Sequence, residues 1–119
     1  NSNNNSVVMK LTYGDTSFLL MGDAEKEEEM DIIKSKADIS SDFIKIGHHG
    51  SNTSTSAPFL NAVNPKYAAI SVADDTNHLP KKDILKRLIS KNIKTYRTDV
   101  NGTLIFMSDG EKISVKTRR

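Results

Sequence analysis

The segment that decides the fold runs from residue 43 to residue 51 and reads FIKIGHHGS. Its first four residues are mostly apolar, which predicts a short buried strand over Phe43–Ile46. The strand leads directly into a histidine pair that is flanked by Gly47 and Gly50. These glycines permit tight backbone geometry and leave space beside the imidazoles. Because open α/β sheets bind ligands beyond the carboxyl ends of their strands, this segment indicates an α/β fold with a site at the strand end.

Apolar, β-branched runs alternate with amphipathic runs on both sides of this segment. The predicted strands are Ser6–Tyr13, Thr16–Met21, Phe43–Ile46, Tyr67–Val72, Ile93–Tyr96, Gly102–Met107 and Lys112–Val115. The predicted helices are Ala24–Lys36, Ala57–Val63 and Lys81–Ser90. Gly14-Asp15 and Asp109-Gly110 are hairpin signals. The alternation argues for an α/β layered fold in which helices cover a sheet.

The composition is that of a soluble globular chain. It has 119 residues, of which 36% are hydrophobic and 27% charged, and this suits one domain or part of one. The net charge of +2 does not mark the whole chain as a nucleic-acid binder, and the lack of cysteine excludes disulfides and thiolate metal sites. No run approaches the roughly 18 apolar residues of a membrane helix, so we expect no membrane segment in this chain. The opening NSNNNS is typical of the interior of a longer protein.

Charge is unevenly distributed along the chain. Residues 24–31 (AEKEEEMD) are acidic and suit the first turn of a helix, whose positive end favours carboxylates. Residues 81–97 hold seven lysines and arginines: Lys81, Lys82, Lys86, Arg87, Lys91, Lys94 and Arg97. We interpret this basic run as the solvated face of an amphipathic helix, with a phosphate-attracting patch as the alternative.

Four polar residues stand where predicted strands end. Asp23 follows the second strand, His48 and His49 follow the third, and His78 comes after the fourth. Imidazole nitrogen and carboxylate oxygen form an ordinary ligand set for Zn²⁺ or Mn²⁺. A carboxylate that bridges two such cations would let them orient a water and stabilise the reacting oxygens of a phosphodiester.

Each of these residues also has a structural interpretation. Asp23 could cap the following helix, the histidine pair could be structural, and His78 could be an ordinary surface residue. The cluster SNTSTS at residues 51–56 indicates capping and turn chemistry rather than a nucleophile, with Ser56 as a helix cap.

Three segments in order resemble the metallo-β-lactamase domain of ComEC-like competence proteins and their stand-alone relatives. They are NNNSVVMKLTYGDTSFLLMGDAE at 3–25, FIKIGHHGSNTSTSAPFLNAVNPKYAAISV at 43–72 and HLPKKDILKRLISKNIKTYRTDVNGTLIF at 78–106. The most specific elements are GDAE, GHHGS and YRTDxxG, and the match covers nearly the whole chain. The resemblance implies that residues 1–119 form a single partial domain, the C-terminal half of a four-layer αββα sandwich.

The resemblance also implies roles for the candidate residues. Asp23 would bridge two metal ions, Zn²⁺ or Mn²⁺, and His49 would be a metal ligand. His48 would act catalytically or as a second ligand, and His78 would contact substrate or protonate the leaving group. The chain departs from the family at Asn77-His78-Leu79-Pro80, where the family has GHP.

The HxHxDH-type motif that supplies most metal ligands in the family is absent from the chain. We therefore expect part of a phosphodiesterase or nuclease-like hydrolase, related to DNA uptake and inactive alone. The alternative is a non-catalytic α/β binding or assembly module without metal. The apolar strands Ser6–Tyr13 and Thr16–Met21 should expose a face, to be covered by the missing N-terminal half or by a homodimer mate. A competence protein would place the chain in a membrane-associated or extracytoplasmic setting; otherwise it would be secreted or cytoplasmic.

Overall fold

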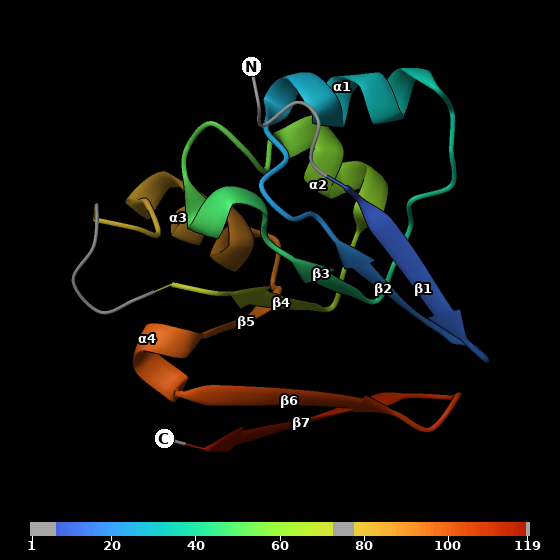
Figure 1. Cartoon of the computed structure of the whole chain (residues 1–119), viewed down its shortest axis with the longest axis vertical. Helices are drawn as coiled ribbons and strands as arrows, with labels where there is room; N and C mark the ends of the chain where they lie inside the picture. The colour runs from blue at the N-terminus through green and yellow to red at the C-terminus, as the bar shows by residue number, and fades with distance from the viewer. Residues whose placement is uncertain (1–6, 73–77, 119) are drawn as a thin grey trace.

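A five-stranded mixed sheet forms the centre of the protein, in a computed structural model that describes residues 7–72 and 78–118 (Figure 1). The strand order is β1-β2-β3-β4-β5. The strands are β1 (Met9–Tyr13), β2 (Thr16–Leu20), β3 (Phe43–Lys45), β4 (Tyr67–Ile70) and β5 (Lys94–Arg97). β1 is antiparallel to β2, whereas β2 to β5 are mutually parallel, so the carboxyl ends of four strands meet at one edge.

Three helices cover one face of this sheet, namely α1 (Lys26–Lys34), α2 (Ala57–Val63) and α3 (Lys82–Ser90) (Figure 1). Their apolar stripes pack on the strands and form the main core, in which Leu19, Ile44, Phe59, Leu60 and Leu88 are fully buried. Because each parallel connection passes through this helical layer, the loops at the carboxyl edge are anchored on both sides.

A two-stranded hairpin of β6 (Thr103–Ser108) and β7 (Ile113–Arg118) lies against the opposite face of the sheet (Figure 1). The short helix α4 (Thr98–Asn101) joins it to β5. Phe43 and Phe106 meet there with ring centroids 4.5 Å apart, and Ala69 and Ile113 are buried beside them. The result is a mixed α/β fold with three layers, which agrees with the α/β class expected from the sequence.

The predicted order of strands and helices is confirmed across the described residues, with two additions. These are α4 and a 3-10 turn over Gly47–Gly50, here called η2. The helix that was predicted from Ala24 begins at Lys26, and the first strand begins at Met9. The polar opening at residues 1–6, and residues 73–77 of the loop before His78, lie outside the described residues.

The expected exposed apolar face is present on β1 but absent on β2. Met9, Leu11 and Tyr13 are 48%, 53% and 61% exposed. In β2, by contrast, Leu19 is buried under the helices and Phe18 packs in the core beneath the hairpin. The expectation for β2 was wrong because the hairpin, which comes from the end of the chain, covers that strand. Within the described ranges, no helix has both the length and the apolar content that a membrane span requires.

Candidate functional site

Asp23 and His49 meet at the carboxyl edge of the sheet. Asp23 lies just beyond β2 and His49 just beyond β3, and these strands are parallel neighbours. Oδ1 of Asp23 is 3.7 Å from Nε2 of His49, and both side chains are about half exposed. The structure therefore brings together the two residues that the sequence proposed as metal ligands, on a surface that solvent can reach.

The η2 turn holds both histidines in an unusual backbone conformation. His48 and His49 have φ values of 48° and 54°, which lie in the left-handed region. Non-glycine residues there cost on the order of 1–3 kcal/mol, and such strain clusters at functional sites. The turn is fixed because the His48 amide donates to the Gly22 carbonyl at 3.0 Å, and the Ser51 amide donates to the His48 carbonyl at 2.9 Å.

Gly50, which closes the turn, packs directly on Pro80. A Cβ added at Gly50 would lie 2.5 Å from the Pro80 Cβ, and the φ of +80° itself favours glycine. The Lys81 amide donates to the Gly50 carbonyl at 2.9 Å. The segment that follows His78 is thereby fastened to the histidine turn.

A hydrogen bond of His49 determines which of its ring nitrogens carries the hydrogen and which keeps a lone pair. Nδ1 lies 2.6 Å from the backbone carbonyl oxygen of Ser71, beyond β4. A carbonyl oxygen can only accept, so Nδ1 carries the hydrogen and Nε2 of the neutral ring keeps its lone pair. That lone-pair nitrogen is the one beside Asp23, which is the arrangement that a metal-binding histidine requires.

His48 contacts a different carboxylate. Its Nδ1 lies 3.0 Å from Oε2 of Glu25, and the Thr53 hydroxyl donates to the same oxygen. The two histidine rings are 6.5 Å apart between centroids. His48 thus lies beside the Asp23–His49 pair, but its own hydrogen-bonding partners come from the start of α1 and the Ser/Thr loop.

His78 is exposed and has a φ of 53°. No hydrogen bond or ion pair among the described residues joins it to Asp23, His48 or His49. Among the described residues, His78 is therefore not joined to the pair by a hydrogen bond or an ion pair, although Pro80 packs on the histidine turn. Its proposed role with substrate stays a prediction.

The alternative in which Asp23 caps α1 does not agree with the structure. α1 begins at Lys26, so the capping position falls on Glu25, and no side-chain cap hydrogen bond forms there. The Ser56 cap, in contrast, is confirmed, since its hydroxyl accepts from the Phe59 amide. Asp23 is thus left at the strand end with its carboxylate toward His49.

Sequence reasoning missed Glu25, Thr53 and Ser71 as residues that position the histidines. Glu25 was read as one of several acids in a helical first turn, although it closes the GDAE motif. Its side chain is only 15% exposed, unlike those of exposed neighbours such as Lys26. Ser71 acts through its backbone carbonyl, so its side-chain identity carried no signal.

Arg97 and Asp99 form a second ordered group beyond the end of β5. Their side chains make a two-pronged ion pair, with Arg97 Nε and Nη2 donating to Asp99 at 2.9 and 2.7 Å. Donation from Arg97 holds the pKa of the Asp99 carboxyl below its usual value, against the opposing effect of burial. Between them, Thr98 exchanges hydrogen bonds of 2.8 Å with the backbone of Val72. The YRTD motif therefore ties β5 to the end of β4.

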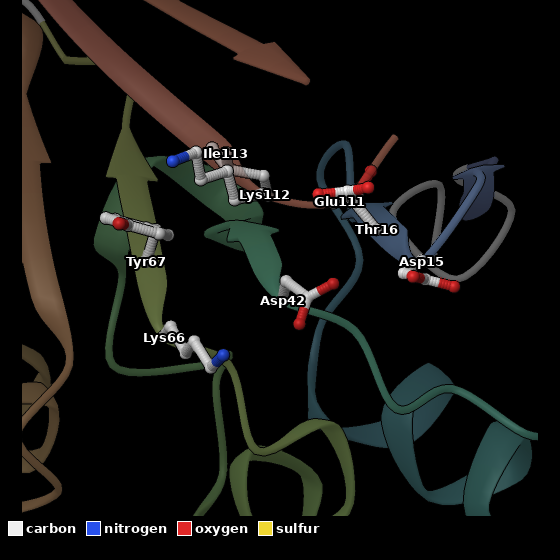
Figure 2. A pocket seen from close by; sticks show the side chains of 8 residues that line it. All are labelled: Asp15, Thr16, Asp42, Lys66, Tyr67, Glu111, Lys112 and Ile113. Carbon is white, nitrogen blue, oxygen red and sulfur yellow. The ribbon is translucent and has the colours of Figure 1, made fainter. Parts of the chain in front are cut away.

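A separate pocket of about 150 Å³ lies at the opposite edge of the sheet (Figure 2). Its side chains come from the β1–β2 turn, the starts of β3 and β4, and the β6–β7 turn, and they include Asp42, Lys66 and Glu111. Asp42 already accepts the Ser17 amide at 3.0 Å, which is a structural contact. None of the four sequence-predicted site residues lines this pocket, so it is separate from the candidate site at the carboxyl edge.

The metal ligands available in the described part of the chain are few. No group of three or more His, Asp or Glu side chains placed to hold a metal ion occurs within residues 7–72 and 78–118. Asp23 and His49 fit two positions of a coordination sphere, because two ligands bonded to one cation at about 2 Å each lie roughly 3–4 Å apart. Further ligands would have to come from elsewhere.

Curated proteins of similar sequence include ComE operon protein 3 of Bacillus subtilis (strain 168) and competence protein ComA of Neisseria gonorrhoeae. Each is 39% identical to the chain, over 103 and 107 residues respectively, or 86% and 87% of the chain. Recombination protein 2 of Haemophilus influenzae is 35% identical over 101 residues, or 84% of the chain. These relatives support a relationship of the chain to the competence (ComEC-like) family. The chain spans only 13–15% of their length, and no protein-family model matches it.

Proposed function

We propose that the chain contributes part of a metal-dependent phosphodiesterase or nuclease-like site to a protein that acts in DNA uptake. The observation that carries the proposal is the 3.7 Å approach of Asp23 Oδ1 to His49 Nε2 at the carboxyl edge of four parallel strands. One similar protein is named a competence protein and another a ComE operon protein, and these names support the link to DNA uptake. The proposed fold is the C-terminal half of a four-layer αββα sandwich, of which helices, sheet and hairpin would be one part.

Asp23 and His49 would hold Zn²⁺ or Mn²⁺. Oδ1 of Asp23 and Nε2 of His49 are 3.7 Å apart, and Nδ1 of His49 is hydrogen-bonded to the Ser71 carbonyl, so Nε2 stays available. A bound pair of cations supplies charge stabilisation to the phosphoryl oxygens and lowers the pKa of an attacking water. The other ligands would come from an HxHxDH-type motif in the N-terminal half of the domain, or from a homodimer mate.

The other two histidines would act on substrate and water. Nδ1 of His48 is hydrogen-bonded to Glu25. Its Nε2 would therefore be able to form a hydrogen bond with substrate or water, or to transfer a proton. His78, whose side chain is exposed, would donate a proton to the departing oxygen. A protein of this kind would work at a membrane-associated or extracytoplasmic location, where it meets incoming DNA.

The competing proposal is a non-catalytic α/β module that keeps this fold without a metal and serves in binding or assembly. The observation in its favour is that the described residues offer only two clustered ligands. Metal analysis of the intact protein that carries this chain separates the two proposals, since only the hydrolase needs bound cations for its activity.

The test compares the intact protein with its Asp23→Ala variant in metal-dependent cleavage of bis(p-nitrophenyl) phosphate and of DNA. We expect the variant to lose activity by at least about 100-fold, because an electrostatic contribution to the transition state disappears. Asp31→Ala, which removes an exposed carboxylate of α1, is the matched control and should keep full activity. Full activity in a well-folded Asp23→Ala protein would defeat the assignment of Asp23, and a wild-type protein without metal or cleavage would favour the binding module.

A further inference from the structure

Glu25 occupies the position before the first residue of α1, yet its side chain does not cap the helix. Ser, Thr, Asp and Asn at this position use a side-chain oxygen to accept a free amide of the first turn, whereas Glu is not among the preferred capping residues. Here the carboxylate is directed to the histidine turn instead, where Oε2 lies 3.0 Å from Nδ1 of His48. The Glu25 carboxylate therefore contacts the histidine turn and does not cap its own helix.

Thr53 contacts the same carboxylate oxygen as His48. Its hydroxyl donates to Oε2 of Glu25. Since that uses its hydrogen, the Thr53 hydroxyl accepts from the Ser51 hydroxyl, 2.9 Å away. Its backbone carbonyl accepts the Lys26 amide at 2.8 Å, which fixes the loop to the start of α1. Thr53 therefore holds both the Glu25 carboxylate, through its hydroxyl, and the first residue of α1, through its carbonyl. These two contacts restrict the position of the carboxylate.

This arrangement determines which ring nitrogen of His48 carries the hydrogen. An ionised carboxylate can only accept, so the neutral ring carries its hydrogen on Nδ1 and its lone pair on Nε2. A carboxylate behind a histidine in this way fixes the tautomer and the ring orientation and raises the basicity of the opposite nitrogen. His49 has the same tautomer because its Nδ1 donates to the Ser71 carbonyl. Both histidines therefore keep the lone pair on Nε2, but different acceptors hold their Nδ1 atoms.

We infer that Glu25, clamped by Thr53, is a positioning residue that holds His48 in the Nδ1–H tautomer so that Nε2 serves metal or substrate. The inference rests on the proposed function for the use to which Nε2 is put. The tautomer itself does not depend on that function and can be measured in the absence of metal and substrate.

The first arm of the test is a long-range ¹H–¹⁵N spectrum of the 119-residue chain, recorded under conditions where His48 is neutral. We expect wild-type His48 in the Nδ1–H form and Glu25→Ala in a mixture dominated by the other tautomer. Glu25→Gln keeps an acceptor oxygen and should retain the wild-type form. Thr53→Val, which removes only the hydroxyl, should shift the mixture in the same direction as Glu25→Ala but less.

The second arm measures kinetics in the intact protein. Loss of a carboxylate behind a functional histidine lowers activity by about 10–100-fold. We expect this loss in kcat for Glu25→Ala with little change in KM, and substantial rescue in Glu25→Gln. Asp31→Ala is the control on the same helix and should match wild type in both arms.

Two results would overturn the inference. One is a folded Glu25→Ala chain whose His48 keeps the wild-type tautomer, because the carboxylate would then only join the loop to α1. The other is a wild-type His48 that lacks the Nδ1–H form. If the tautomer shifts as expected but neither wild type nor variant cleaves phosphodiesters, the positioning role stands and the hydrolase proposal fails.

Discussion

Oδ1 of Asp23 and Nε2 of His49 lie 3.7 Å apart, although α1 and its connection separate the two residues in sequence. The approach follows from the parallel pairing of β2 with β3, which aligns Leu20 with Lys45 and so delivers both strand ends to one edge. The carboxylate and imidazole are about half exposed, so solvent reaches both groups in this fold.

This geometry predicts weak metal binding by the 119-residue chain. Two protein ligands leave most coordination positions to water, so we expect a binding free energy for Zn²⁺ of only about 4–6 kcal/mol. This corresponds to a dissociation constant between tens of micromolar and about 1 mM. Isothermal titration calorimetry measures it. His49→Ala should abolish the binding, whereas Asp31→Ala should not alter it. Nanomolar affinity in the isolated chain would contradict the view that further ligands lie elsewhere.

Glu29 should be the most important acidic residue for stability. It is 1% exposed, and its two carboxylate oxygens accept the amides of Thr55 and Ser56 at 2.5 and 2.9 Å. Glu29→Ala leaves buried donors without acceptors, so we expect the free energy of unfolding to fall by about 2–4 kcal/mol. Urea denaturation followed by circular dichroism measures the change.

Two comparisons sharpen that prediction. Asp31→Ala, on the exposed side of the same helix, should change stability by no more than about 0.5 kcal/mol. Thr55→Ala should lower stability while leaving Zn²⁺ binding unchanged, because Thr55 is buried in the loop and contacts neither Asp23 nor His49 in the described structure. Equal effects of Glu29→Ala and Asp31→Ala would show that the buried contacts of Glu29 contribute little.

The ion pair between Arg97 and Asp99 predicts a dependence of stability on pH. Donation from Arg97 lowers the pKa of Asp99 in the folded protein. The stabilisation is therefore fully present above the unfolded pKa of about 3.9, and it is lost as the pH falls through the lowered folded value. Asp99→Asn should cost about 1–3 kcal/mol near neutral pH, and the difference from wild type should shrink below about pH 4. Denaturant unfolding at a series of pH values tests this, and a difference that stays constant to about pH 2 would contradict it.

Local patterns were sufficient to predict the strands, the helices α1, α2 and α3, and the edge at which Asp23 and His49 meet. The FIKIGHHGS segment predicts a buried strand that ends at the histidines, and the structure shows β3 followed directly by η2. The apolar runs of β2 and β4 likewise identify buried neighbours of that strand. These features depend on periodicity and turn chemistry, which a single sequence records.

Features that depend on distant contacts could not be predicted. Within the run AEKEEEMD, Glu25 faces His48 and Glu29 faces Thr55, whereas Lys26 and Glu27 are exposed. Helical spacing puts Glu25 and Glu29 one turn apart on one face, but nothing in the run says that this face meets the Ser/Thr loop. The hairpin that covers β2 is equally non-local, since β6 begins at Thr103.

The exposed apolar side chains of β1 lie on an edge strand. Within the described sheet, β1 pairs only with β2, so its other side presents unpaired backbone groups. Met9 and Leu11, on the same face, are about half exposed. Edge strands with apolar side chains are sites of pairing with another chain or segment. We propose that either a homodimer mate or the N-terminal half of the domain covers this strand.

Solution association tests that proposal. The 119-residue chain should self-associate with rising concentration in sedimentation velocity experiments, and Leu11→Lys should shift it toward monomer because an edge lysine opposes pairing. Ile89→Lys is the matched control, since Ile89 is 69% exposed on α3, away from β1, and its replacement should leave association unchanged. Addition of the preceding half of the domain should compete with self-association if that half is the natural cover. A chain that stays monomeric at every concentration, and does not bind that half, would show that β1 needs no partner.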